Sequence, residues 1–429
     1  MIRRFRAMLD NMQPLFLPGG KLERYHALFE MVDTLFFSPP DQTRGAPHVR
    51  DAIDLKRVMI VVVFAAVPCV LVGLWNTGFH TNTAMATMGF DTVDGWRGSV
   101  LGMLFAGHDP GSIYDNFALG LLYFVPIYMV TMAAGGFWEI LFSGVRNHEI
   151  NEGFFVTSLL YALILPATTP LWQVALGISF GVVIGKEVFG GTGKNFLNPA
   201  LVGRAFLYFA YPAQMSGDSV WTPVDGISSA TALGISAIEG MSGDSVWTQV
   251  DGFSGATALG ISAIEGMSGI IDSGLTWTQA FLGQMQGSIG ETSTLACLIG
   301  AVVLVYSGIA SWRTMVGVFA GLIIPALLMG FVDSDNPMAG MPWHWHVVLG
   351  GFAFGAIFMA TDPVSSANTD TGKWIYGLLV GFLTFVIRVV NPAFPEGIML
   401  AILFGNIFAP VIDYFVIRAN VKRRILRSG

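Results

Sequence analysis

Long apolar segments are the feature that most constrains how this chain can fold. A helix needs about 20 apolar residues to cross the roughly 30 Å hydrocarbon layer of a bilayer. Seven segments come close to that length, and they are 58–75, 117–138, 294–312, 314–332, 345–360, 374–390 and 397–417. Only 12% of the residues are charged, whereas soluble domains have about 25%. The segments predict a polytopic membrane protein and argue against a soluble protein with buried helices.

Three weaker apolar segments, 153–165, 171–185 and 196–211, raise the expected number of spans to ten. We therefore predict an all-α fold of ten transmembrane helices, in two five-helix halves of opposite orientation. The tripeptide Asn-Pro-Ala occurs at 198–200 and again at 391–393, which is a faint trace of an inverted repeat. Pro166 stops the short third span and Arg204 lies within the fifth. Both features predict broken helices that line a cavity rather than face lipid.

Basic residues predict the topology, because Lys and Arg gather on the cytoplasmic side. The amphipathic arm 1–57 and the tail 418–429 are rich in them, and none occurs between Arg204 and Arg313. We expect both termini in the cytoplasm and no cleavable signal peptide. We expect the segment without basic residues and the acidic loop 76–116 in the periplasm. The expected units are the arm 1–57, a membrane half 58–212, a periplasmic loop 213–292, a membrane half 293–417 and the tail 418–429.

A tandem repeat lies in the predicted periplasmic loop, where residues 241–266 copy residues 215–240. The copies differ only at Pro223/Gln249, Ile227/Phe253 and Ser229/Gly255. Two copies cannot form a solenoid. We interpret the repeat as a recent duplication in an exposed loop, where insertions are tolerated. A pair of functional sites and an error of sequence assembly are the alternatives.

Acidic residues in the apolar segments are the candidate cation ligands, because a charge in hydrocarbon is costly and usually functional. Asp413 interrupts the last span. Asp362 and Glu139 lie at the inner ends of their spans, where a solvated helix end is the alternative. Phe354 and Phe358 are one helical turn apart and form a candidate gate, with plain packing as the alternative.

Other chemistry-bearing residues predict no metal site and no nucleic-acid partner. His344 and His346 alternate with tryptophans at the predicted outer boundary, which is typical of an interfacial aromatic belt. Cys69 and Cys297 are too few for a four-thiolate cluster, so packing explains them. The glycine-rich stretch 190–195 lacks the spacing of a nucleotide-binding loop.

Residues 251–257 read DGFSGAT and precede an apolar helix predicted at 258–264. The Asp-Gly pair predicts a turn, and Ser254 is a candidate helix N-cap. Thr257 then lies in the first turn, where free N–H groups and the helix dipole favour a phosphate group. A capped helix without any ligand is the alternative.

Several long motifs occur in one order over nearly the whole chain. They read HVRDAIDLKR, GGFWE, NEGFFVTS, EVFGGTGKNFLNPAL, DGFSGAT, MPWHWH, GGFAFG, FMATDPVS and RVVNPAFPEG. In these motifs the chain resembles the B-type subunit of the bacterial sodium-translocating NADH:quinone oxidoreductase. The D-type subunit of the ferredoxin-linked Rnf complex is similar in its membrane core and flavin motif, but it lacks the N-terminal arm.

The resemblance implies a flavin mononucleotide (FMN) joined through its phosphate to the threonine of an S-G-A-T motif. Ser254, Gly255 and Thr257 match that motif, so Thr257 is the expected attachment site. Thr231 holds the same place in the first repeat copy, where Ser229 replaces the glycine. Thr231 is therefore the fallback.

The resemblance also implies a non-covalent riboflavin, for which Asn195 and Asn198 are the matching positions. Their alternative role is to cap a broken helix. The family's quinone-associated positions at the inner interface correspond here to Gly135, Gly136, Glu152, Phe154 and Phe155.

The function implied by the resemblance is that of a bacterial inner-membrane subunit of a redox-driven sodium pump. Electrons would pass from NADH through partner subunits and the flavins to quinone. Implied partners are a subunit with NADH, FAD and iron–sulfur sites, a second subunit with covalent FMN, small membrane subunits and a flavin transferase. An Rnf-type subunit, a channel or transporter without a redox role, and an inert scaffold are the alternatives. Only the flavin motif separates the redox functions from the others.

Overall fold

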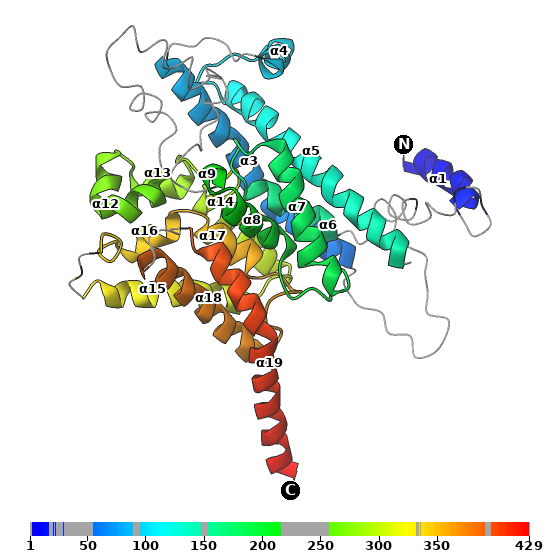
Figure 1. The fold of residues 1–429 in the computed structure, drawn as a ribbon, viewed down its shortest axis with the longest axis vertical. Coiled ribbons are helices and arrows are strands. Elements are labelled where there is room, and N and C mark those ends of the chain that lie inside the picture. The colour runs from blue at the N-terminus through cyan, green and yellow to red at the C-terminus, as the bar shows by residue number, and fades with distance from the viewer. Residues whose placement is uncertain are drawn as a thin grey trace.

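The computed structural model describes residues 2–16, 20, 22, 29, 55–88, 95–146, 153–215, 257–331, 334, 336–390 and 396–428. These residues are helical or irregular, and none of them forms a β-strand. The prediction of an all-α fold is therefore confirmed for the described part of the chain. Figure 1 shows the arrangement, in which α1 (Ile2–Phe16) lies apart from the main helical body.

The first group of helices runs as far as the predicted periplasmic loop. It consists of α3 (Leu55–Met88), α4 (Trp96–Met103), α5 (Ile113–Arg146), α6 (Gly153–Leu163), α7 (Leu171–Gly185), η2 (Glu187–Phe189), α8 (Pro199–Ala210) and α9 (Pro212–Met215). The second group consists of α12 (Ala258–Asp272), α13 (Trp277–Leu282), α14 (Thr294–Tyr306), α15 (Trp312–Met329), α16 (Trp343–Val348), α17 (Phe352–Phe354), the π-helix η4 (Gly355–Met359), α18 (Asp370–Val390) and α19 (Ile398–Ser428).

Six helices in the described ranges are long and apolar enough to cross a membrane, namely α3, α5, α7 with η2, α15, α18 and α19. Three shorter apolar helices, α6, α8 and α14, accompany them. Each predicted span therefore contains helix, but the count of ten spans and the inverted repeat stay predictions. The second Asn-Pro-Ala, at 391–393, lies outside the described residues.

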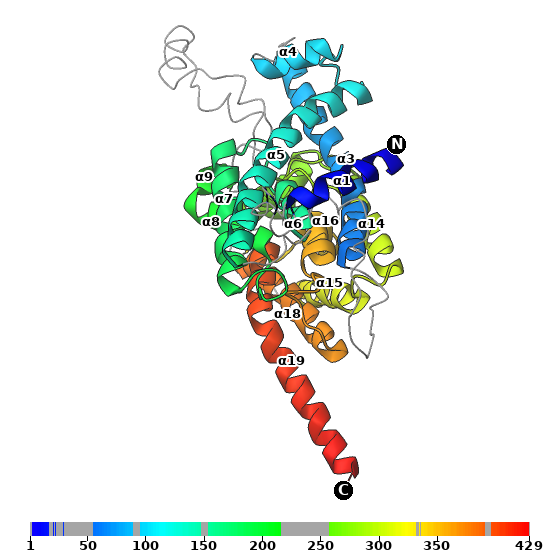
Figure 2. The same cartoon turned by 90° about the vertical axis from the view of Figure 1, so that its right-hand side faces the viewer.

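Helices α3 and α5 are longer than the sequence predicted. Each has 34 residues, which corresponds to about 51 Å at 1.5 Å per residue. The predicted loop 76–116 is therefore wrong for residues 76–88, which continue α3, and for residues 113–116, which begin α5. Polar residues there find partners inside the protein: Asn76 Nδ2 donates to the Met285 carbonyl at 2.9 Å, and Asn82 Nδ2 donates to Asn116 Oδ1 at 2.8 Å. Figures 1 and 2 both show the two helices side by side.

The span predicted at 345–360 is not one continuous helix. Helix α16 ends at Val348, Gly350 has a φ of +65°, and the chain resumes helical geometry at α17. The fully buried Arg388 of α18 donates to the carbonyls of His346 and Leu349, at 2.5 and 2.9 Å. These bonds satisfy carbonyls that the break leaves without a helical partner, which is the condition for irregular backbone at membrane depth.

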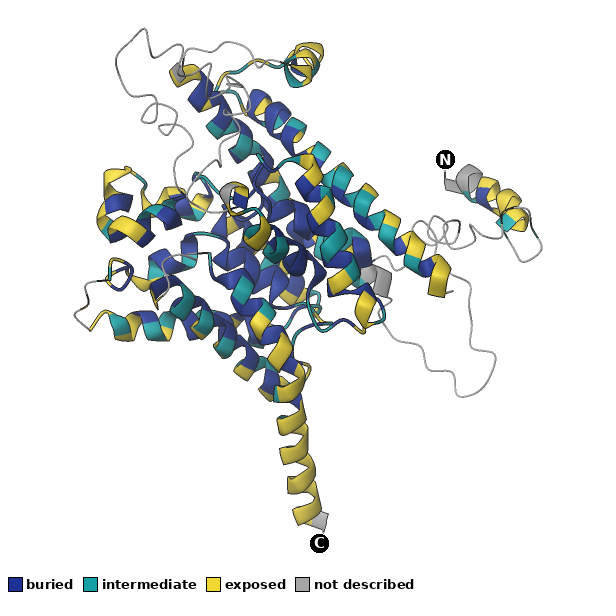
Figure 3. Cartoon of the chain, viewed as in Figure 1, coloured by how far each residue is buried: buried dark blue, intermediate teal, exposed yellow. Residues whose placement is uncertain are grey.

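The short helix α6 ends in a similar way. The N–H groups of Ile289 and Gly290, which precede α14, donate to the carbonyls of Leu165 and Leu163 at 3.1 and 2.7 Å. The broken elements meet in the centre of the molecule, where Figure 3 shows mostly buried residues. By contrast, the C-terminal part of α19, from residue 417 to 427, is exposed and extends away from the body.

Candidate functional site

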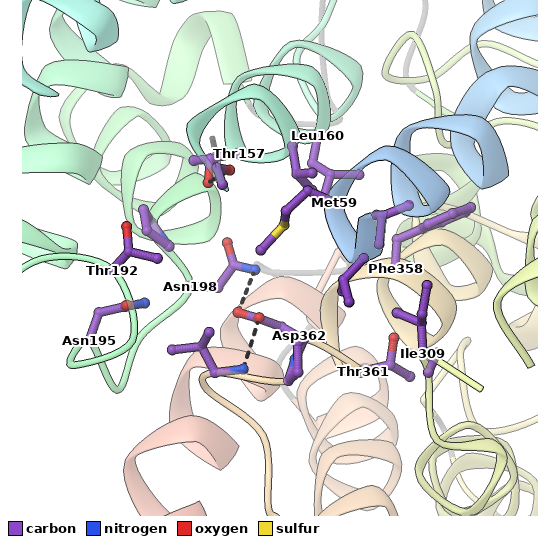
Figure 4. A pocket seen from close by; sticks show the side chains of 18 of the residues that line it. Met59, Thr157, Leu160, Thr192, Asn195, Asn198, Ile309, Phe358, Thr361 and Asp362 are labelled. Atoms are coloured by element: carbon purple, nitrogen blue, oxygen red, sulfur yellow. Dashed lines mark hydrogen bonds between the residues drawn. The ribbon is translucent and has the colours of Figure 1, made fainter. Parts of the chain in front are cut away.

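A cavity of about 790 Å³ lies between the two groups of helices (Figure 4). Its walls come from α3, α6, the segment between α7 and α8, the end of α14, and η4 with the loop that follows it. The residues labelled in Figure 4 are Met59, Thr157, Leu160, Thr192, Asn195, Asn198, Ile309, Phe358, Thr361 and Asp362. Apolar side chains therefore surround a small number of hydroxyl, amide and carboxylate groups, which is the usual make-up of a cofactor site.

Asn198 has a structural role and also faces the cavity. It is the N-cap of α8, since its Oδ1 accepts from the N–H groups of Ala200 and Leu201 at 3.0 and 3.4 Å. Its Nδ2 donates to Asp362 Oδ2 at 3.4 Å. Asn195 Nδ2 donates to the carbonyl of Leu197 at 2.8 Å. Asn198 therefore does have the capping role that the sequence offered as an alternative. The side chains of Asn195 and Asn198 nevertheless both line the cavity.

Asp362 and Phe358 lie in the same cavity as the two asparagines. Asp362 accepts from Ser365 Oγ at 2.7 Å and from the Val364 N–H at 3.1 Å. The rings of Phe354 and Phe358 are 5.0 Å apart, and both belong to the run that ends in η4, a π-helix. Such π-turns are frequent at functional sites. The structure therefore brings together residues that the sequence had assigned to a cation path and to a flavin.

Glu139 is buried in α5 and forms an ion pair with Lys186, with Nζ 2.5 Å from Oε1. Lys186 also lines the cavity. Next to it, Glu187 pairs with Arg146 at 3.1 Å. Sequence reasoning missed Lys186 as the partner of Glu139, although a lysine at a predicted inner turn was the available signal. Removing one partner of such a buried pair strongly destabilises the folded protein, because the other charge is left buried and uncompensated.

Asp413 does not line the cavity. Its carboxylate accepts from the N–H groups of Asn368 and Thr369 at 2.6 and 3.0 Å, and from Thr369 Oγ1 at 2.5 Å. Asp413 therefore ties α19 to the segment that begins α18. This structural role was not part of the sequence argument, and the predicted place of Asp413 in a cation path stays a prediction.

Of the predicted quinone residues, Gly135 and Phe154 pack against each other. A Cβ built on Gly135 would lie 2.5 Å from Phe154 Cε2, whereas one on Gly136 would lie 3.9 Å from Cε1 of the same ring. Gly135 thus lets the buried Phe154 pack directly on α5. Phe155 is half-buried, and Glu152 lies outside the described residues.

Thr257 is the N-cap of α12, and its Oγ1 accepts from the Gly260 N–H at 3.1 Å. The predictions that Ser254 caps this helix and that Thr257 lies in its first turn are therefore wrong, because the helix begins only at Ala258. It lines a second cavity of about 290 Å³, which Gly350 also lines. A Cβ built on Gly350 would lie 3.3 Å from Arg388 Nη2, so a guanidinium lies close to this cavity. A helix N-terminus and a nearby cation fit a phosphate group. Ser254, Gly255 and Thr231 lie outside the described residues.

Arg204 and two glutamates form a charged cluster at this second cavity, which both glutamates line. Arg204 Nη2 lies 2.6 Å from Glu396 Oε2, and Arg204 Nη1 lies 3.5 Å from Glu291 Oε1 and 3.0 Å from Ser288 Oγ. The sequence singled out Arg204 but not its partners, which are more than 80 residues away. Within the described ranges, no three His, Cys, Asp or Glu side chains gather as a metal site.

Comparison with known proteins identifies the family to which the chain belongs. Residues 42–422 match the model of the NQR2, RnfD, RnfE family. The chain is 58% identical to the B-type subunit of the Na(+)-translocating NADH-quinone reductase of Chromohalobacter salexigens, over 99% of this chain and 97% of that protein. It is 55% identical to the proteins of the same name from Ectopseudomonas mendocina and Pseudomonas aeruginosa, over 99% of both chains in each case. These matches confirm the resemblance found in the motifs. The chain therefore belongs to the NQR2, RnfD, RnfE family, alongside proteins named as the B-type subunit of Na(+)-translocating NADH-quinone reductase.

Proposed function

We propose that the chain is a membrane subunit of a sodium-translocating NADH–quinone reductase. In this role it carries electrons, which partner subunits take from NADH, through a covalent FMN and a riboflavin to quinone, and the transfer drives sodium outward. The observation that carries the proposal is the full-length similarity to relatives of that name. The Rnf branch of the same family is the second candidate, because the family model includes RnfD.

The proposed riboflavin site is the cavity of about 790 Å³. Its lining is mostly apolar with a few hydroxyl, amide and carboxylate groups, which is the usual make-up of a ligand pocket. The flavin ring edge has both donors and acceptors, and the amide groups of Asn195 and Asn198 on the cavity wall suit such an edge. Thr192 Oγ1 is buried without a hydrogen-bond partner and is available to such an edge. When bound, the flavin supplies one- and two-electron transfer, and the apolar walls exclude water.

The proposed FMN site is Thr257. Its hydroxyl lies at the N-terminus of α12, where N–H groups stabilise the negative charge of a phosphate. Arg388 beside Gly350 adds a positive charge near the same cavity. Attachment by a flavin transferase requires this segment to lie in the periplasm. That location agrees with the topology predicted from the basic residues, with both termini in the cytoplasm.

The proposed quinone site surrounds Gly135 and Phe154, at the inner end of α5 and α6. Phe154 offers an aromatic face for a flat quinone ring, and Gly136 leaves open space beside it. The proposed sodium path includes Asp362 and the gate formed by Phe354 and Phe358. Asp362 lies on the wall of the riboflavin cavity. Its electrostatic energy therefore changes with any change of charge on a group bound there.

The covalent flavin provides the test of the proposed function. In the assembled complex, Thr257→Ala should abolish flavin fluorescence of this subunit in a denaturing gel, and Thr231→Ala should leave it intact. A fluorescent wild-type subunit excludes a channel, transporter or scaffold without a redox role. If the wild-type subunit carries no flavin, the proposed electron path is wrong. If only Thr231→Ala loses fluorescence, the first repeat copy is the attachment site.

A further inference from the structure

The cluster of Arg204, Glu291 and Glu396 lies where the broken helices meet. Arg204 belongs to α8, Glu291 precedes α14, and Glu396 lies two residues before α19. The side chains are 4%, 4% and 11% exposed. One guanidinium faces two carboxylates, so the cluster has a net charge of −1 when all three groups are ionised. Helix α19 then runs for 31 residues to the basic tail, so the cluster lies at the opposite end of that helix.

Two oxygen atoms of this region have no hydrogen-bond donor. Glu291 Oε1 lies 3.5 Å from Arg204 Nη1 but accepts no hydrogen bond, and the hydroxyl of Thr292 has no partner. Both residues are at least 96% buried, and both line the cavity of about 290 Å³. An unpaired buried polar group costs about 1–3 kcal/mol. A bound species that satisfies both oxygens would remove this cost.

The backbone around the cluster is shaped to admit the glutamate. A Cβ on Gly351, in the break between α16 and α17, would lie 2.7 Å from Glu291 Cδ. The carboxylate therefore lies directly across a position that only glycine leaves open. Breaks in transmembrane helices are where membrane transporters place their substrate and coupling ions. The sequence identified the broken helices but not the acid that lies against the break.

The donor atoms determine which ligand fits. Glu291 and Thr292 offer oxygen atoms only, which suit hard cations rather than transition metals. The excess charge of −1 within the cluster matches a single positive charge. A phosphate attached to Thr257, which lines the same cavity, would add negative charge and favour a cation further. Arg204 moderates the attraction, and moderate affinity is what an ion pathway needs for release.

We propose that Glu291 and Thr292 bind a sodium ion, at the end of the membrane domain opposite the basic tail. Arg204 is a positioning residue that holds Glu396 and keeps the net charge at −1. The inference rests on the proposed function of a sodium pump. It adds an ion site that is separate from Asp362 and that shares a cavity with the proposed FMN attachment at Thr257.

The test uses the assembled complex with Glu291→Gln and Thr292→Val. Gln keeps the shape of Glu291 and leaves Arg204 paired with Glu396, and Val keeps the shape of threonine. The matched control is Thr314→Val in α15, because the Thr314 hydroxyl is also buried without a partner but lies outside the cavity. The measurements are equilibrium binding of radioactive sodium to the purified complex and the sodium concentration for half-maximal NADH–quinone reductase activity. Flavin content and melting temperature report on assembly.

We expect Glu291→Gln to raise both sodium constants by about tenfold, which corresponds to about 1.4 kcal/mol. Thr292→Val should raise them about threefold or more, and the control should match the wild type. If the Glu291→Gln complex does not assemble, the sodium constants of Thr292→Val, compared with those of the Thr314→Val control, decide whether the inference holds. Unchanged sodium constants, an equal change in the control, or a change in pH dependence alone would overturn the inference. A wild-type complex that sodium does not stimulate would instead refute the proposed function.

Discussion

Gly135 and Gly136 are adjacent on α5, yet the structure predicts different effects for the same substitution. In Gly135→Ala the new Cβ would lie 2.5 Å from Phe154 Cε2, about 1 Å or more closer than the roughly 3.5–4.0 Å of favourable carbon–carbon contact. The ring must move, and overpacking of this kind costs about 1–3 kcal/mol. If bound quinone requires Phe154 in its present place, that cost weakens binding. It corresponds to a roughly 5- to 150-fold rise in the quinone concentration for half-maximal rate.

Gly136→Ala is the matched control, because its Cβ would lie 3.9 Å from the same ring. Both variants gain about 1 kcal/mol of helix propensity, so the difference between them isolates the ring contact. The assay is quinone reduction by NADH at varied quinone, together with flavin reduction by NADH, which should be normal in both. Equal quinone constants in the two variants, or a larger effect of Gly136→Ala, would refute the role of Phe154.

Three further predictions concern the other acids and the cavity wall. Asp413→Ala should impair sodium-stimulated turnover with flavin content intact, and it should lower the melting temperature because it removes three hydrogen bonds; normal sodium dependence would leave only the structural role. Asn195→Ala should reduce the riboflavin recovered by acid extraction, whereas Asn198→Ala should also cost about 1 kcal/mol through the lost cap; equal stability of the two would contradict the capping geometry. Lys186→Met should destabilise the subunit by about 3–5 kcal/mol, and adding Glu139→Gln should restore much of that in thermal unfolding; no recovery would show that the pair is not coupled.

The apolar segments predicted where helices occur, but not how far they extend or where they break. The polar residues 76–88 indicated a loop, and they are helical because their side chains bond to α5 and to the segment after α13. The run 345–360 indicated one helix, and it is broken because Arg388, far along the chain, binds the carbonyls of His346 and Leu349. Both causes are contacts between distant segments, which local hydrophobicity does not report.

The candidate site residues were identified one at a time, and their grouping was not predictable. Asn198 and Asp362 are separated by 164 residues in the chain, yet their side chains are 3.4 Å apart. Motif similarity indicated that the amide of Asn198 binds a flavin. The cost of burying a charge indicated that the carboxylate of Asp362 binds a cation. Neither argument contains the information that α8 and the loop after η4 share a cavity. That information comes from the packing of broken helices, whose ends point inward.

Hydrogen bonding ranks the buried acids differently from the sequence. An acid at membrane depth is a functional candidate by default, and that rule selected Asp413 and Glu139 but not Glu291, which the sequence placed in the predicted periplasmic loop 213–292. Asp413, however, already accepts three hydrogen bonds from one segment, and Glu139 is paired with Lys186 at 2.5 Å. Glu291 keeps one carboxylate oxygen without a donor. Because an ion needs acceptor oxygens that no donor occupies, sodium affinity should be more sensitive to Glu291 than to either of the other two.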